Sequence, residues 1–235
     1  MIKQKRSQEN LIYLSSQLSK ILKKSFGKGP DSCYCTLREQ IVFFHIRQFK
    51  TPAEEVLLQK GETNLATKLR KTIMDAIFEQ FKQELDKILD IEFESFLQDW
   101  NFETNTGLVI FISKVSESNN DITSQLNQTK NEILEDQIAI VYSEVYKAPR
   151  HVRTFEVTET ICVLECTNVI SPLEIQLYKK GMEYSDVLLS HSNDLKKSIR
   201  SNRERFSSGF NLKIYDVFIF LDYKTSKNYV VFYLK

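Results

Sequence analysis

Hydrophobic residues recur at helical spacing in two long segments of the first half of the chain. Leucine and isoleucine return every three or four residues from Gln8 to Ser25, and a similar pattern fills Asn64 to Leu89. Apolar residues at such spacing place one face of a helix against a core. Two amphipathic helices are therefore predicted, with buried stripes of Leu11, Leu14, Leu18, Ile21 and Leu22 in the first and Leu69, Ile73, Ile77, Phe81, Leu85 and Ile88 in the second.

Apolar runs of strand length follow these helices. One strand is predicted over Arg38 to Arg47. A hairpin is predicted from the strands Ile91 to Gln98 and Leu108 to Ser113, with Asn105-Thr106-Gly107 in its loop. The predicted order is helix–strand–helix–helix–strand–strand. This order is typical of an α+β fold, in which helices pack on a small antiparallel sheet.

The short segment between the first strand and the second long helix is predicted to be a capped helix. Thr51 as N-cap and Glu54 as the third helical residue form a capping box, and Pro52 suits the first helical position. Gly61 would end this helix in the left-handed conformation. The motif therefore has a complete structural explanation.

The same order of motifs recurs about 120 residues later, which indicates an internal repeat. Thr51-Pro52-Ala53-Glu54 recurs as Ser171-Pro172-Leu173-Glu174, Gly61 recurs as Gly181, and Asp99-Trp100 aligns with Asp222-Tyr223. We predict two tandem domains, residues 1–115 and 122–235, joined by a polar linker at 116–121. The elements expected in the second domain are helices over Thr123 to Tyr146, Ser171 to Lys180 and Glu183 to Phe206, and strands over Glu156 to Glu165, Leu212 to Leu221 and Asn228 to Leu234.

Both alternating sets of residues in the predicted strands are apolar. Ile41 and Phe43 share one face, whereas Val42, Phe44 and Ile46 share the other. A sheet covered by helices on one face only should alternate apolar with polar residues, so the second face needs a cover. We expect the halves to form an intramolecular pseudo-dimer with an approximate two-fold axis, and the same logic admits a homo-oligomer. The contact candidates are Phe44, Phe96, Phe218 and Phe220.

Composition and charge exclude several classes of protein. The 32 Lys and Arg residues balance 31 Asp and Glu residues, which gives no global reason to bind nucleic acid. No run approaches the roughly 18–20 apolar residues of a membrane helix, so no transmembrane segment is expected. The N-terminus lacks the features of a signal peptide, which favours the cytoplasm. The basic first helix admits a peripheral position on an anionic membrane, but packing against its own sheet is the favoured explanation.

The cysteines do not have the spacing of a zinc site. They form Cys-x-Cys and Cys-x-x-x-Cys pairs rather than paired Cys-x-x-Cys knuckles. Each pair would lie on one face of a strand as reduced, half-buried thiols. Neither a metal nor a cofactor is predicted from Cys33, Cys35, Cys162 and Cys166.

Five residues are candidates for binding a ligand. Gly27, Lys28 and Gly29 lie in a glycine loop whose backbone N–H groups and ammonium could hold an anion, although glycines that simply end a helix give the same sequence. Glu54 and Asp99 add carboxylates, which the cap and a hairpin turn would also explain. No catalytic residue is assigned, because neither a Ser-His-Asp nor a Cys-His arrangement can be built around His45, His151 and His191.

A basic cluster in the second half is open to two interpretations. Its side chains form either a solvated helix face or an anion patch, and nucleic-acid binding through it would fall steeply with salt. We predict the solvated face for Lys196, Lys197, Arg200, Arg203 and Arg205.

Several of these motifs occur together in one bacterial family. The run Phe26-Gly27-Lys28-Gly29-Pro30, the Thr51-Pro52-Ala53-Glu54 cap, and Asp99-Trp100 with Thr106-Gly107 before the last strand resemble the MpsC-like family. That family is named for a sodium-linked, membrane-potential-generating system. The resemblance is strong over Gln8 to Lys114 and weak over Glu132 to Lys235, where Tyr146 and Ala148 replace the two glycines.

The resemblance implies a cytosolic protein with no established catalytic residue. It favours a non-enzymatic binding or accessory protein whose partner belongs to a membrane ion or bicarbonate transport complex. The alternative is an enzyme acting on an anionic small molecule where Lys28, Glu54 and Asp99 converge.

Overall fold

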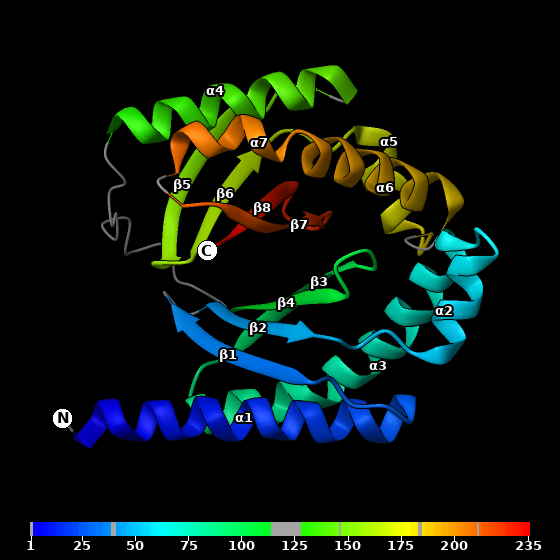
Figure 1. The fold of residues 1–235 in the computed structure, drawn as a ribbon, viewed down its shortest axis with the longest axis vertical. Helices are drawn as coiled ribbons and strands as arrows, with labels where there is room; N and C mark the ends of the chain where they lie inside the picture. Colours follow the sequence, from blue (N-terminus) through cyan, green and yellow to red (C-terminus); the bar gives the residue numbers. More distant parts are fainter. Residues whose placement is uncertain (1, 39–40, 114–127, 146, 183–184, 211) are drawn as a thin grey trace. The chain divides into compact units, whose positions relative to one another are not determined.

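The computed structural model describes residues 2–38, 41–113, 128–145, 147–182, 185–210 and 212–235. The chain divides into two compact units, Met1–Asn120 and Asp121–Lys235, and each unit is described by itself (Figure 1). The predicted linker at 116–121 lies outside the described residues.

The first unit alternates helices with two β-hairpins. Its sheet has the strand order β1-β2-β4-β3, and all neighbouring strands are antiparallel. The elements are α1 (Ile2–Phe26), β1 (Ser32–Arg38), β2 (Ile41–Arg47), α2 (Pro52–Gln59), α3 (Thr63–Leu89), β3 (Phe93–Asn101) and β4 (Thr106–Ser113).

The α+β prediction is confirmed, but each sheet has four strands rather than three. The single strand predicted over Arg38 to Arg47 begins at the last residue of β1 and includes all of β2. The strand left out of the predicted order, β1, has the mixed sequence Ser-Cys-Tyr-Cys-Thr-Leu-Arg and lies at the sheet edge, and it contains the strand face expected for Cys33 and Cys35. Edge strands need fewer apolar residues than central strands, so apolar patterning did not find it.

The helices of the first unit cover one face of its sheet. Helices α1 and α3 lie along the same side of this sheet (Figure 1). Val42, Phe44 and Ile46 of β2 belong to the core that the sheet shares with these helices. Phe111 of β4 lies at the centre of this core, with aromatic rings from both layers at 5.6–6.3 Å between ring centroids. These rings belong to Phe44, Phe78, Phe81, Phe93 and Phe96.

This arrangement corrects two of the expected contact residues. Phe44 and Phe96 were expected on the second face of the sheet, but they pack against the unit's own helices. The second face is nevertheless apolar, as the alternation predicted. It carries Ile41, Phe43, Leu97, Leu108 and Ile110. The predicted two-fold axis stays a prediction.

The buried stripe predicted for α3 is confirmed at Ile77, Phe81 and Leu85 but differs at the start of the helix. Leu69 is 36% exposed, whereas Ala66, Arg70 and Met74 are buried.

The second unit repeats the architecture, with the strand order β5-β6-β8-β7. The long helix predicted over Glu183 to Phe206 is divided at Asn202, where α6 ends. The predicted start of the first helix of this unit, Thr123, lies outside the described residues. The elements are α4 (Gln128–Val145), β5 (His151–Thr158), β6 (Ile161–Thr167), α5 (Pro172–Lys179), α6 (Asp186–Ser201), α7 (Arg203–Phe206), the 3-10 helix η1 (Ser207–Gly209), β7 (Ile214–Asp222) and β8 (Lys227–Leu234).

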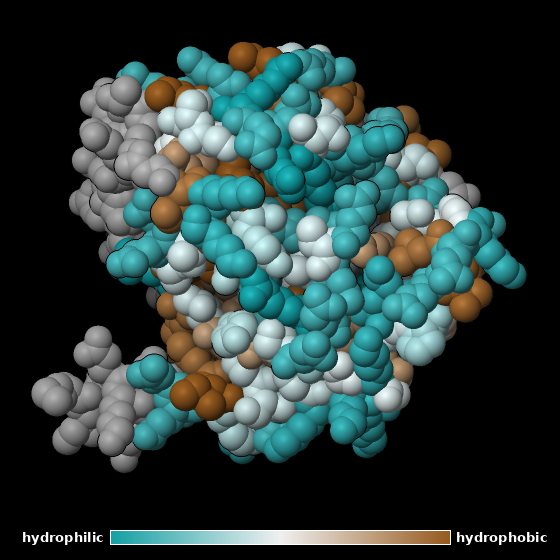
Figure 2. Space-filling model, in the orientation of Figure 1, coloured by the Kyte–Doolittle hydropathy of each residue, from teal (hydrophilic) through white to brown (hydrophobic). Residues whose placement is uncertain are grey.

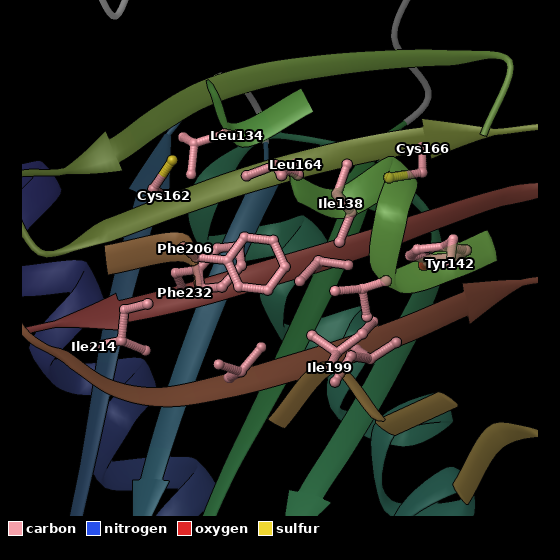
Figure 3. Close-up of a cluster of buried hydrophobic side chains, with 14 of the residues drawn as sticks. Leu134, Ile138, Tyr142, Cys162, Leu164, Cys166, Ile199, Phe206, Ile214 and Phe232 are labelled. Atoms are coloured by element: carbon pink, nitrogen blue, oxygen red, sulfur yellow. The ribbon is translucent and has the colours of Figure 1, made fainter. Parts of the chain in front are cut away.

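The second core also lies between the helices and one face of the sheet. Figure 3 shows α4 contributing Leu134, Ile138 and Tyr142, which meet side chains of β6 and β8. Val217 and Ile219 of β7 face this core, so Phe218 and Phe220 lie on the opposite face by strand alternation.

Strand register gives the correct alignment of the two units in the last hairpin. Asn101 pairs with Thr106, and Asp222 pairs with Lys227, so the offset between the hairpins is 121 residues. Asp222 therefore occupies the position of Asn101, not that of Asp99 as predicted. The side chains agree, because Asn101 and Asp222 both accept hydrogen bonds from backbone N–H groups two and three residues later.

Candidate functional site

Three loops meet at one end of the sheet in the first unit, and we call this region the loop junction. Lys28, after α1, donates from Nζ to the Lys50 carbonyl at 2.9 Å. Asn105, in the β3–β4 turn, accepts at Oδ1 from the N–H groups of Phe49 and Lys50 at 2.9 and 2.7 Å. Gln48 also donates its N–H to the Asn105 carbonyl. The junction consequently fixes the entry into α2.

Local backbone geometry explains the sequence at this junction. Gln48 and Asn105 both have left-handed backbone, with φ of 54° and 53°. Asparagine tolerates this conformation better than most residues, and its amide can bond nearby backbone groups. Gly27 has φ of 72° just after α1, so it ends that helix without steric penalty.

Glu54 is fully buried at the start of α2. Its Oε2 accepts from the N–H and the hydroxyl of Thr51, each at 2.8 Å, while the Glu54 N–H donates to Thr51 Oγ1. Pro52 occupies the first turn, and Gly61 follows the helix with φ of 77°. The predicted capping box is therefore formed.

Arg70 of α3 completes this arrangement. Its guanidinium donates to both Glu54 oxygens and, at 2.8 Å, to the Phe49 carbonyl. The guanidinium carbon lies 4.3 Å from the Trp100 ring centroid and 5.2 Å from that of Phe102. A bidentate ion pair with additional bonds is the arrangement in which a buried charge is well compensated.

Arg70 was not among the residues predicted to be functional. The available signal was an arginine at helical spacing from Ala66 and Met74, on an otherwise apolar stripe. A buried arginine needs an acidic partner, and the capping Glu54 was the suitable residue nearby.

The expected binding residues do not form one site. Gln98 and Trp100 of β3 point toward α3, since Gln98 Nε2 donates to Asp75 and Trp100 lies over Arg70. Asp99 lies between them and therefore faces the other side of the sheet, where its Oδ1 accepts from the Trp100 N–H at 2.9 Å. Gly29 lies in the loop after α1, where a Cβ would come within 3.2 Å of Lys23. Asp99 thus lies on the opposite face of the sheet from Arg70, the partner of Glu54.

The second unit keeps the capping box without the arginine. Ser171 donates its N–H to Glu174 Oε2 at 2.8 Å, and Pro172 and Gly181 occupy the same places as their counterparts. Glu174 Oε1 is buried and accepts no hydrogen bond from any residue that the structure describes. His191 of α6 approaches it, with Nδ1 at 3.7 Å from Oε1.

The four cysteines are free thiols packed toward the helices. Burial raises the pKa of Cys33 and that of Cys162 to about 12, and it also raises the pKa of Cys35 and Cys166. These thiols are therefore protonated near neutral pH. Among the described residues, no group of three or more His, Cys, Asp or Glu side chains is placed to hold a metal ion.

Part of the basic cluster is engaged in local contacts. Arg200 Nε donates to the Val217 carbonyl at 3.0 Å, and Arg205 Nη1 lies 3.1 Å from Glu144 Oε1. Arg203 pairs with Glu204. These contacts fit a helix face held by its own unit.

Comparison with known families bears on the first unit. Residues 8–114 match the family model described as Na+-translocating membrane potential-generating system (MpsC). The first unit is MpsC-like. The match spans the MpsC-like unit from α1 to the end of β4, and it includes the whole loop junction. The second unit lies outside the match, so its membership in the family stays a prediction.

No curated protein and no solved structure gives a significant match to the chain. Within the part of the chain that the structure describes, the helices are too short or too polar to cross a membrane.

Proposed function

We propose that this protein is a non-enzymatic accessory component of a sodium-translocating membrane system, where it binds another subunit. The observation that carries this proposal is the match of residues 8–114 to the MpsC family, whose description names such a system. The proposal goes further than the match, since a family description does not assign a binding role.

The use of polar groups in the MpsC-like unit supports binding over catalysis. Glu54 is neutralised by Arg70, and Lys28 is bonded to a backbone carbonyl. Asp99 faces the opposite side of the sheet from Glu54. A general acid and base must both reach one substrate, and the two carboxylates face opposite sides of the sheet.

We propose the α2–α3 segment as the contact surface for the partner subunit. Figure 2 shows a mainly hydrophilic surface on which hydrophobic side chains are exposed in small, separate groups. In the MpsC-like unit, Val56 of α2 is 51% exposed, and Leu65 and Leu69 of α3 are 48% and 36% exposed. Burying apolar side chains of this kind against a partner is favourable, because it removes apolar surface from water.

Co-purification from the native host in mild detergent tests the proposal. The wild-type chain is expected to recover subunits of the sodium-translocating complex, identified by mass spectrometry. The variant V56S/L65S/L69S is expected to lose them. The matched control E55S/Q59S/K68S changes exposed polar residues of the same helices and should keep them.

The opposite result is equally clear. Recovery of the wild-type chain without membrane proteins, together with an unchanged sodium-dependent membrane potential after gene deletion, would contradict an accessory role. If the two triple variants recover the same subunits equally well, the α2–α3 contact surface would be contradicted but the accessory role would not.

A further inference from the structure

The position of Arg70 is taken by a different residue in the second unit. Met74 and Phe78 in the buried stripe of α3 correspond to Leu195 and Ile199 of α6, at an offset of 121 residues. The same offset places His191 where Arg70 stands. The approach of His191 to Glu174 agrees with this alignment.

Because histidine replaces arginine, the Glu174 carboxylate lacks the guanidinium partner that Glu54 has in the first unit. The Glu174 side chain is 2% exposed, and its Oε2 is held by the capping box. Oε1 has no hydrogen-bond donor among the described residues, and 3.7 Å to His191 is too long for a hydrogen bond. A buried acceptor without a donor is energetically costly, so the group favours any donor that can reach it.

An aromatic surface next to this carboxylate is retained. The 121-residue offset of the last hairpin places Tyr223 at the position of Phe102, one of the rings over which the Arg70 guanidinium lies. Tyr223 stacks on Tyr178 of α5, with ring centroids 5.3 Å apart. Burial and, to a smaller extent, the charge of Glu174 raise the pKa of Tyr223, so the phenol and the carboxylate are neighbours.

Solvent reaches this region beside His191, whose side chain is 52% exposed. A ligand could therefore approach Glu174 by displacing an imidazole rather than by opening the core. The ligand would meet a carboxylate oxygen and an aromatic face.

We propose that the second unit binds a guanidinium group at Glu174, in the place that Arg70 fills within the first unit. A guanidinium donates through a planar fork to a carboxylate and stacks on aromatic rings, which an ammonium does less well. The group could belong to free arginine or to an arginine side chain in a peptide. This inference does not depend on the proposed accessory role.

Calorimetric titration of the full chain with methylguanidinium chloride tests the inference, with methylammonium chloride at equal ionic strength as the control probe. The wild type is expected to bind methylguanidinium at one saturable site and methylammonium more weakly. E174Q, which removes the charge, should bind about tenfold more weakly or worse. H191R, which supplies a guanidinium within the chain, should not bind.

Two further measurements make the test decisive. H191R should unfold at a higher urea concentration than the wild type, because the added arginine pairs with Glu174. Free L-arginine and N-acetyl-arginine amide are then compared, and the tighter ligand identifies a small molecule or a peptide as the source. Absence of saturable wild-type binding, or equal binding by wild type, E174Q and H191R, would overturn the inference.

Discussion

Arg70 is 2% exposed, and its guanidinium forms an ion pair with the buried Glu54 carboxylate, to which Thr51 also donates hydrogen bonds. It also connects α3 to α2, to the Phe49 carbonyl and to the Trp100 ring. A single side chain thus joins the helix layer to the loop junction. Its removal would leave a carboxylate buried without its charge partner.

The variant R70A is therefore expected to lower the unfolding free energy of the first unit by about 3–5 kcal/mol. Trp100 is the single tryptophan of the chain and lies beside Arg70, so its fluorescence during urea unfolding reports on this unit. The control R200A removes an arginine that bonds a backbone carbonyl in the second unit, and it should leave the Trp100 transition unchanged. Equal transitions for R70A and wild type would contradict the assigned role.

Strands β1 and β6 each direct two cysteines toward the helices of their own unit. Cys33 and Cys35 are two residues apart, and Cys162 and Cys166 are four apart, so each pair shares one face of its strand. Close packing of these strands against helices keeps the thiols away from water. The raised pKa values follow from this packing rather than from a reactive site.

This packing predicts slow thiol chemistry in the folded protein. At pH 8, well below a pKa of about 12, Cys33 and Cys162 stay protonated, and the reactive thiolate appears only as the pH approaches that value. A disulfide reagent followed by absorbance should react slowly in buffer and rapidly in denaturant, with all four cysteines modified. A native rate equal to that of free cysteine at pH 8 would show that the strands are not packed as described.

At the scale of the whole molecule, the decisive feature is the second face of each sheet. In the first unit this face is apolar, and the unit's own helices lie on the other face. A large apolar face in water favours association. The fold of one unit therefore predicts how that unit behaves when it is separated from the rest of the chain.

A fragment of residues 1–115 is expected to dimerise or aggregate at tens of micromolar, as measured by sedimentation. The variant F43D places a charge on the apolar face, beside Ile110, and should shift the fragment toward the monomer. Circular dichroism would establish that both fragments keep their secondary structure. A wild-type fragment that stays monomeric would contradict the need for a cover.

Several elements could be predicted from the sequence because local interactions decide them. The helix predicted over Asn64 to Leu89 is observed as Thr63–Leu89, and both capping boxes are formed where Thr51 and Ser171 indicated. Helical spacing, caps and hairpin turns involve residues close in the chain. These elements can therefore be predicted from the local sequence without knowledge of the tertiary fold.

The tertiary structure alone decided the features that depend on distant residues. The strand β1 exists because β2 offers it an edge, and the face of Asp99 follows from the register of β3. Arg70 and Glu54 meet across 16 residues, while the 121-residue offset of the last hairpin places Asp222 at Asn101. Composition and periodicity determined which elements form, whereas packing and strand register determined which side chains meet, since a shift of one residue turns a side chain to the other face.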